Sequence, residues 1–323
     1  MNTEIYYFTS TGNSLVVARD IAERINGTLV SISSTRDKEH ISTDAEVIGL
    51  VFPVYYASFG RSGLPRIVEH FAGKLQAIDS KYLFAICTHS GGPVDTIENL
   101  DKILRSRGGK LAVGFGVQTG IPYAPSAKIK YALFHRELQM DRLADDAKRQ
   151  ALFVAWRTKL DVLQRQIDIR EKGKVEVRNT TAKIVGTPWL LLQRRMAVAR
   201  YQTLANSRSQ SLDELIPLAD TGFDVGETCN GCGICARICP VGNIQIADNR
   251  PVWQHHCETC YACFQWCPRN AIHGSIVEYE KRAHHPQVKV VDMLKQTAQT
   301  DSAQERGSHR RHICLRCCSM KGA

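Results

Sequence analysis

Two stretches of the sequence repeat one spacing of cysteines. Residues 229–240 read CNGCGICARICP and residues 257–268 read CETCYACFQWCP, so both follow the pattern C-x2-C-x2-C-x3-C-P. A cubane of four irons and four sulfides takes four thiolate ligands, and this spacing is typical of [4Fe-4S] sites. A tight loop can place three thiolates on one face of a cluster, and the fourth must come from elsewhere. The predicted ligands are Cys229, Cys232, Cys235, Cys239, Cys257, Cys260, Cys263 and Cys267.

Zinc is the alternative, because paired C-x2-C knuckles also suit a tetrahedral zinc ion. Two complete motifs, each closed by a proline, favour clusters. Eleven of the 12 cysteines follow residue 228 in a long chain without a secretory pattern, which favours metal ligation over disulfides. Cys87 ends an apolar run, and we expect it to be a small buried side chain. The tail could bind zinc too, although cysteines in a basic terminus are more often unligated; its candidates are His312, Cys314, Cys317 and Cys318.

A second candidate site is the polar segment FTSTGNS, residues 8–14, between a strand-like and a helix-like run. Free N–H groups and the positive end of a helix dipole at such a position suit a phosphate. The segment lacks the G-K-[ST] ending of triphosphate loops and the three spaced glycines of the dinucleotide fingerprint. A cradle without charged side chains favours a tightly held monophosphate, and a helix N-cap is the alternative. The predicted contacts are Thr9, Ser10, Thr11, Gly12, Asn13 and Ser14.

Two further loops follow strand-like runs: PVYYASFG after EVIGLVF, and THSGGP after KYLFAIC. Ligands of open α/β sheets bind beyond the carboxyl ends of the strands. Aromatic side chains offer flat faces, and a glycine-rich backbone can approach a ring edge, so the three loops together fit a phosphate with a ring system attached. The predicted ring contacts are Pro53, Val54, Tyr55, Tyr56, Ala57, Phe59, Thr88, His89, Ser90, Gly91 and Gly92.

The elements that must position these residues alternate between strand and helix patterns over residues 1–124. Five strand-like runs and helices at about 14–25, 63–74 and 94–107 predict an α/β fold with a doubly wound, five-stranded parallel sheet. Apolar residues at helical spacing predict a helical connector over 125–217. We expect its apolar stripes to pack against the neighbouring domains, with a membrane-surface or partner-docking helix as the alternative. A small α+β domain over 218–280 and a basic tail over 281–323 complete the chain.

The net charge of +10 is unevenly distributed. Residues 1–124 balance, 125–212 carry 18 basic and 8 acidic side chains, 213–280 carry 3 and 9, and the remainder carries 9 and 3. Such blocks indicate faces that meet partners. Two clusters and one bound monophosphate would remove about six positive charges, which weakens a nucleic-acid reading. The sequence predicts no transmembrane segment and no secretory signal, and we expect a cytoplasmic protein.

The first 120 residues resemble flavodoxins. The flavodoxin phosphate loop reads T/S-x-T-G-x-T/S and is matched here by Thr9, Thr11, Gly12 and Ser14. The order of the segments, to about Ile276, resembles the flavodoxin-ferredoxin fusion proteins of anaerobes. The resemblance implies FMN, two [4Fe-4S] clusters and electron transfer. In two-cluster ferredoxins the fourth cysteine ligates the other cluster. The implied ligand sets are Cys229, Cys232, Cys235 and Cys267 for one cluster and Cys257, Cys260, Cys263 and Cys239 for the other.

We therefore expect a redox carrier that couples one-electron and two-electron partners, such as a ferredoxin or a partner oxidoreductase. The alternative is an FMN-dependent reductase of a small substrate that receives electrons through its clusters. Its candidate proton donors are Tyr55, Tyr56, His89 and Ser90. A third class is a binding module whose basic segments hold an acidic protein or nucleic acid, and nucleic acid is disfavoured because no recognition motif accompanies the charge. The sequence assigns no catalytic residue, no nicotinamide site and no oligomeric state.

Overall fold

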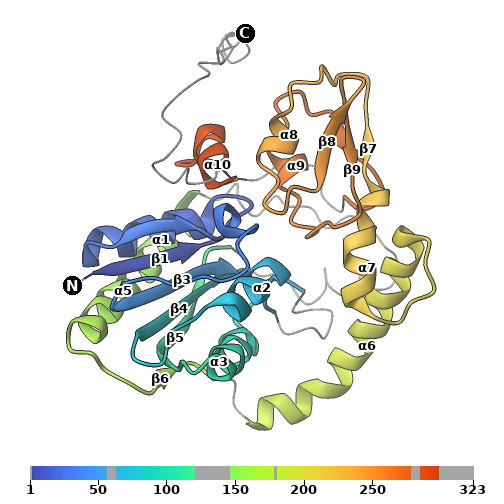
Figure 1. The fold of residues 1–323 in the computed structure, drawn as a ribbon. Helices are drawn as coiled ribbons and strands as arrows, with labels where there is room; N and C mark the ends of the chain where they lie inside the picture. Colours follow the sequence, from blue (N-terminus) through green and yellow to red (C-terminus); the bar gives the residue numbers. More distant parts are fainter. Residues whose placement is uncertain (1, 57–62, 121–145, 178–179, 278–283, 298–323) are drawn as a thin grey trace.

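The N-terminal half of the protein is built on a six-stranded parallel sheet with the order β2-β1-β3-β4-β5-β6. The computed structural model describes residues 2–56, 63–120, 146–177, 180–277 and 284–297 (Figure 1). The strands are β1 (Thr3–Tyr7), β2 (Thr28–Ser31), β3 (Val47–Pro53), β4 (Tyr82–His89), β5 (Leu111–Gln118) and β6 (Lys174–Val175). All neighbouring strands pair in parallel. The order 2-1-3-4-5 within this sheet is that of flavodoxin-like folds.

Helices cover both faces of the sheet, which explains why its strands read as continuous apolar runs. Apolar side chains of α1 and α5 pack on one face, and those of α2 and α3 pack on the other (Figure 1). The helices are α1 (Asn13–Ile25), α2 (Arg66–Lys74), α3 (Thr96–Ser106) and α5 (Asp146–Asp168). Between β2 and β3 stands only a short 3-10 turn, η1 (Ile32–Thr35), where the sequence is also weak as a helix.

The prediction of five strands is wrong by one, because β6 adds a sixth at the edge next to β5. β6 has only two residues, too few to show any periodicity in the sequence. It follows α5, whose buried Trp156, Leu160, Leu163 and Ile167 pack into the sheet domain. The segment expected to be a connector is thereby divided, since its first helix belongs to the sheet domain.

The second helix of that segment, α6 (Thr180–Ala205), packs with α7 (Leu212–Leu218) and a short turn, η4 (Ala219–Gly222), beside the cysteine-rich region (Figure 1). Its last turns bury Ala197, Val198 and Tyr201. Leu191 and Leu192, in contrast, are about half exposed. The expectation of apolar stripes packed on the neighbouring domains therefore holds for α5 from Trp156 onward and for the end of α6, whereas Val154 of α5 is exposed. None of the described helices combines the length and the apolar character needed to cross a membrane.

The two cysteine motifs share one backbone conformation. A four-residue helix starts just before the third cysteine of each motif, and the residue before it has positive φ: Gly233 (71°) before α8 (Ile234–Arg237) and Tyr261 (59°) before α9 (Ala262–Gln265). Positive φ recurs two residues after each first cysteine, at Gly231 and Thr259. Left-handed residues turn the chain tightly, so these loops can direct several cysteines inward. The surrounding strands are β7 (Asp224–Val225), β8 (Ile244–Ala247), β9 (Arg250–Trp253) and β10 (Ile272–His273).

A last segment, residues 284–297, ends in α10 (Val290–Thr297), which lies between the sheet domain and α8 (Figure 1). It contacts both η1 and α8. The chain thus returns from the cysteine-rich region to the edge of the sheet where β1 ends.

Candidate functional site

The loop between β1 and α1 has buried hydroxyl groups around a left-handed glycine. Gly12 is the N-cap of α1 with φ of 92°, and no side chain caps the helix. Thr9 Oγ1 accepts a hydrogen bond from Gly12 N at 3.0 Å, and Thr9, Ser10 and Ser14 are buried. The first turn of α1, from Asn13, has N–H groups without a carbonyl partner in their own helix. These groups suit an anion, and the hydroxyls are free of the capping role that was the alternative.

Hydrogen bonds join this loop to the ends of β3 and β4. Ser14 Oγ lies 2.8 Å from Thr88 Oγ1, and Tyr55 donates its hydroxyl hydrogen to Ser10 Oγ at 2.7 Å. The structure therefore brings residues from all three predicted loops together at the carboxyl ends of neighbouring strands. This edge is where open α/β sheets bind ligands, at the reversal of strand order between β1 and β3.

The two tyrosines after β3 have different surroundings. Tyr55 is partly buried, and its ring meets those of Phe8 and Tyr56 edge-on, both with centroids 5.8 Å away. Tyr56 is buried with φ of 54°, and its hydroxyl donates to the main-chain oxygen of Glu258 and accepts from Thr259 Oγ1. Burial raises the pKa of Tyr56 well above its usual value. Tyr56 is thus a contact to the second cysteine motif, and the hydroxyl of Tyr55 contacts the candidate phosphate loop.

The structure describes some of the other predicted ring contacts but not all of them. Pro53 and Val54 are partly buried, whereas Ala57 and Phe59 lie outside the described residues. Beyond the end of β4, Ser90 and Gly91 are exposed, and apart from the chain neighbours no atom of the described residues lies within 4 Å of a Cβ position at Gly91 or Gly92. The loop after β4 is therefore open on that side.

His89, a candidate proton donor, lies against the neighbouring strand β5. A Cβ on Gly116 would approach His89 Nε2 to 2.7 Å, so the imidazole fills the space beside that glycine. Burial and, secondarily, the Lys159 ammonium group lower the pKa of His89 to about 4. A neutral imidazole is a poor acid near pH 7, which weakens this part of the reductase alternative.

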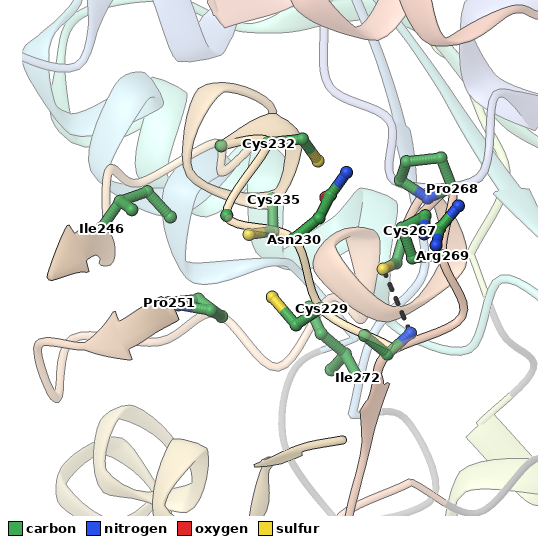
Figure 2. A pocket seen from close by; sticks show the side chains of 13 residues that line it. Cys229, Asn230, Cys232, Cys235, Ile246, Pro251, Cys267, Pro268, Arg269 and Ile272 are labelled. Atoms are coloured by element: carbon green, nitrogen blue, oxygen red, sulfur yellow. Dashed lines mark hydrogen bonds between the residues drawn. The ribbon is translucent and has the colours of Figure 1, made fainter. Parts of the chain in front are cut away.

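Four cysteines line one cavity of the cysteine-rich region. We call Cys229, Cys232, Cys235 and Cys267 the first cysteine set; Figure 2 shows them around a cavity with about 340 Å³ of empty space, open to solvent. Burial, and to a smaller extent the other three thiols of the set, raise the pKa of the Cys235 thiol to about 12. Thiolates at these positions therefore need a compensating cationic group.

The second cysteine set, Cys239, Cys257, Cys260 and Cys263, is more deeply enclosed. Burial raises the pKa of Cys257 well above its usual value, and neighbouring Cys260, Cys263 and Cys239 add to the effect. Cys260 packs against the core of the sheet domain on the face that α2 and α3 cover. Cys263 lies close enough to Cys235 of the first set for an electrostatic interaction between the two thiols, so the two sets are neighbours.

Main-chain N–H groups point at three of the sulfurs. Asn243 N donates to Cys239 Sγ at 3.2 Å, Thr259 N to Cys257 Sγ at 3.2 Å, and Ala271 N to Cys267 Sγ at 3.3 Å. Hydrogen bonds of this kind stabilise anionic sulfur and influence the potential of iron-sulfur sites. Among the residues that the structure describes, no three His, Cys, Asp or Glu side chains meet closely enough for a single metal ion. The thiols of the first set surround a space, which fits a cluster.

Hydrogen bonds also join the second cysteine motif to the sheet domain beside the loops that are predicted to bind the phosphate and the ring. Trp266 Nε1 donates to Ser10 O at 2.7 Å, and Glu258 Oε1 accepts from Arg66 N, at the start of α2, at 2.6 Å. Neither Trp266 nor Glu258 is among the site residues that the sequence predicts. Neither contact has a local signal, because its partners are 256 and 192 residues apart. His312, Cys314, Cys317 and Cys318 lie outside the described residues.

Comparisons with known proteins give only partial likenesses. No protein-family model matches the chain, and no curated protein matches it. Among solved structures, a flavodoxin of Streptococcus pneumoniae shares 11% identity over 39% of this chain and 89% of its own, with a TM-score of 0.29. Flavodoxin 1 of Bacillus cereus shares 14% over 39% and 88%, with a TM-score of 0.28. An azoreductase of Bacillus anthracis shares 9% over 51% and 99%, with a TM-score of 0.31.

Proposed function

We propose that this protein binds FMN at the loops after β1, β3 and β4 and two [4Fe-4S] clusters in its two cysteine sets, and that it carries electrons between redox partners. When bound, FMN exchanges one or two electrons and each cluster exchanges one. The carrier would thereby couple one-electron partners to two-electron partners.

The observation that carries the proposal is the direct contact between the second cysteine motif and the loop after β3. Tyr56 reaches Glu258 and Thr259, which stand between two cysteines of the motif. Cys260 packs against the sheet domain itself. Both candidate sites therefore share one interface, which is what transfer of electrons between two bound groups requires.

The residues at this interface also exclude water. Tyr56, Glu258, Thr259 and Trp266 are each less than 9% exposed, although all four carry polar groups. Each of these polar side chains has a hydrogen-bond partner across the interface, so burial leaves none of them unsatisfied. A dry interface that is held by hydrogen bonds fixes the separation of the two sites.

Anaerobic reconstitution with iron, sulfide and FMN tests the proposal. We expect one flavin and about eight irons per chain. Reduction of the clusters by a low-potential donor should then bleach the flavin absorbance in a first-order process whose rate does not depend on protein concentration. A chain that binds no flavin, or far fewer than about eight irons, refutes the proposal.

One observation favours the reductase as a second candidate: the loop after β4 is open beside Gly91 and Gly92. A small acceptor could approach a ring held there. Turnover of such an acceptor by the reconstituted protein, without any added redox protein, distinguishes a reductase from a carrier.

For the carrier we propose a ferredoxin or an oxidoreductase as the partner. The cavity of the first cysteine set opens beside the exposed residues Asn230, Pro268 and Arg269, and exchange with another protein needs such access. An acidic ferredoxin could also be steered by the basic residues beyond 297. Removing residues 298–323 should then weaken the salt dependence of reduction by ferredoxin, and an unchanged dependence excludes this role.

A further inference from the structure

Residues 284–297, which we call the C-terminal strap, lie on the candidate phosphate loop. His285 N donates to Thr11 O at 2.8 Å. Val288 is 3% exposed and lies so close to Gly12 that a Cβ on that glycine would come within 2.8 Å of it. The loop that follows β1 therefore has a wall formed by the other end of the chain.

The strongest contact of the strap is the side chain of Gln296. Its amide forms two hydrogen bonds with the main chain of Thr9: Thr9 N donates to Oε1 at 3.0 Å, and Nε2 donates to Thr9 O at 3.0 Å. Gln296 is completely buried. The preceding residue, Phe8, still bonds to β3 through Val51 O, so Gln296 takes over where the pairing of the strand ends. A side-chain amide is suited to this, because it offers one donor and one acceptor side by side.

Fixing Thr9 has consequences along the loop. The hydroxyl of Thr9 accepts from Gly12 N, and Gly12 starts α1, whose first N–H groups face the candidate anion site. Without Gln296, the buried N–H and C=O of Thr9 would lose both partners, and the loop would have to shift to satisfy them. The position of the phosphate contacts thus depends on a residue 287 positions away in the sequence.

The strap is held independently of Gln296. Asp292 pairs with Arg19 of α1 at 2.6 Å, and the hydroxyl of Thr297 donates to the main-chain oxygen of Arg237 in α8. These contacts tie the strap to the sheet domain on one side and to the first cysteine motif on the other. A change at Gln296 alone therefore leaves the strap anchored.

We propose that Gln296 is a positioning residue for the flavin phosphate: through Thr9 it holds the phosphate loop in the conformation that binds FMN. This inference rests on the proposed function. It assigns to the strap a part of the binding site that no motif in the loop itself reveals.

The test compares FMN with riboflavin, which has the same ring and no phosphate. In the full chain, Gln296→Met keeps the length and flexibility of the side chain and removes both hydrogen bonds. Titration followed by flavin fluorescence should show FMN binding weakened about tenfold or more and riboflavin binding changed by less than about twofold. Lys295→Met, an exposed neighbour on the same helix, should leave both affinities unchanged.

Iron content and circular dichroism of each variant report whether the rest of the chain is folded. Should Gln296→Met fail to fold, Gln296→Glu gives the same comparison, since it keeps one hydrogen bond and sets a carboxylate oxygen against Thr9 O. Equal losses for FMN and riboflavin, or no loss for either, would overturn the inference while the proposed function stands. If the wild-type chain binds no FMN, both the inference and the proposed function are refuted.

Discussion

Replacing Gly12 by alanine should destabilise the protein in a way that depends on Val288. Gly12 has φ of 92°, and a left-handed conformation costs a residue with a side chain about 1–2 kcal/mol. The new Cβ would also lie 2.8 Å from both Cβ and Cγ2 of Val288, closer than real contacts allow. Overpacking of this kind costs about 1–3 kcal/mol. We therefore expect Gly12→Ala to lower the free energy of unfolding by about 2–5 kcal/mol.

A double-mutant cycle separates the two contributions. The three atoms nearest to the new methyl group are Cβ, Cγ1 and Cγ2 of Val288, and Val288→Gly removes them, so it relieves the overpacking and leaves the φ cost. As a single change, Val288→Gly should lower the free energy of unfolding by about 2–4 kcal/mol, because a buried side chain is lost and the unfolded chain gains backbone freedom. The double variant should be about 1–3 kcal/mol more stable than the sum of the single effects predicts.

The assay is urea unfolding of the flavin-free protein, followed by tryptophan fluorescence and by circular dichroism, and the cycle uses the transition on which both probes agree. Gly73→Ala is the matched control, because no atom lies within 4 Å of its Cβ position and it stands inside α2. It should stabilise the chain by about 0.5–1 kcal/mol and show no coupling to Val288→Gly. Additivity of Gly12→Ala and Val288→Gly within about 0.5 kcal/mol would mean that the strap does not lie on the loop.

Three further outcomes follow from the site. Thr11→Asp puts a negative charge beside the phosphate, worth about 4 kcal/mol at 4 Å, so FMN binding should fall more than 100-fold with iron content unchanged; retained flavin contradicts the loop assignment. Cys267→Ala should lower the iron content by about four per chain and Cys87→Ala, in the sheet core, by none, as measured by iron analysis. The pKa of His89 is lowered to about 4, so its stabilising contribution is complete above pH 6.5 and is lost as the pH falls towards 4. Unfolding of His89→Gln should then depend less on pH across that window, and an identical pH profile argues against a buried neutral His89.

The sequence predicts the sheet domain because its strands are fully buried. β3 and β4 read as unbroken apolar runs, and each is followed by turn residues, so type and order are both readable. β6 cannot be predicted in this way, since a strand of two residues is too short to form an apolar run. The helical stripe of α5 is also readable, yet Val154 in that stripe is 66% exposed and Leu160 is fully buried. Periodicity gives a helix and its approximate apolar face, and the neighbouring elements decide which turns are covered.

The candidate site divides in the same way. Cysteine spacing and the polar loop after β1 are local patterns, and the structure brings the members of each together. Tyr56 illustrates what a local pattern cannot give: two adjacent tyrosines look equivalent, but a left-handed backbone at Tyr56 turns it towards Glu258. Gln296 is similar, because a glutamine in an amphipathic helix gives no sign of a partner in the loop after the first strand.

The side of the sheet on which the cysteine-rich region docks is itself informative. Hydrogen bonds join Trp266 to Ser10 and Glu258 to the start of α2, and the adjoining C-terminal strap joins Gln296 to Thr9, all at the carboxyl edge of the parallel strands. A region that served only to enlarge the core could cover an apolar face or extend an edge of the sheet. Docking at the carboxyl edge instead encloses the loops where this fold binds its ligands, so the contacts that stabilise the interface also shield the site from water.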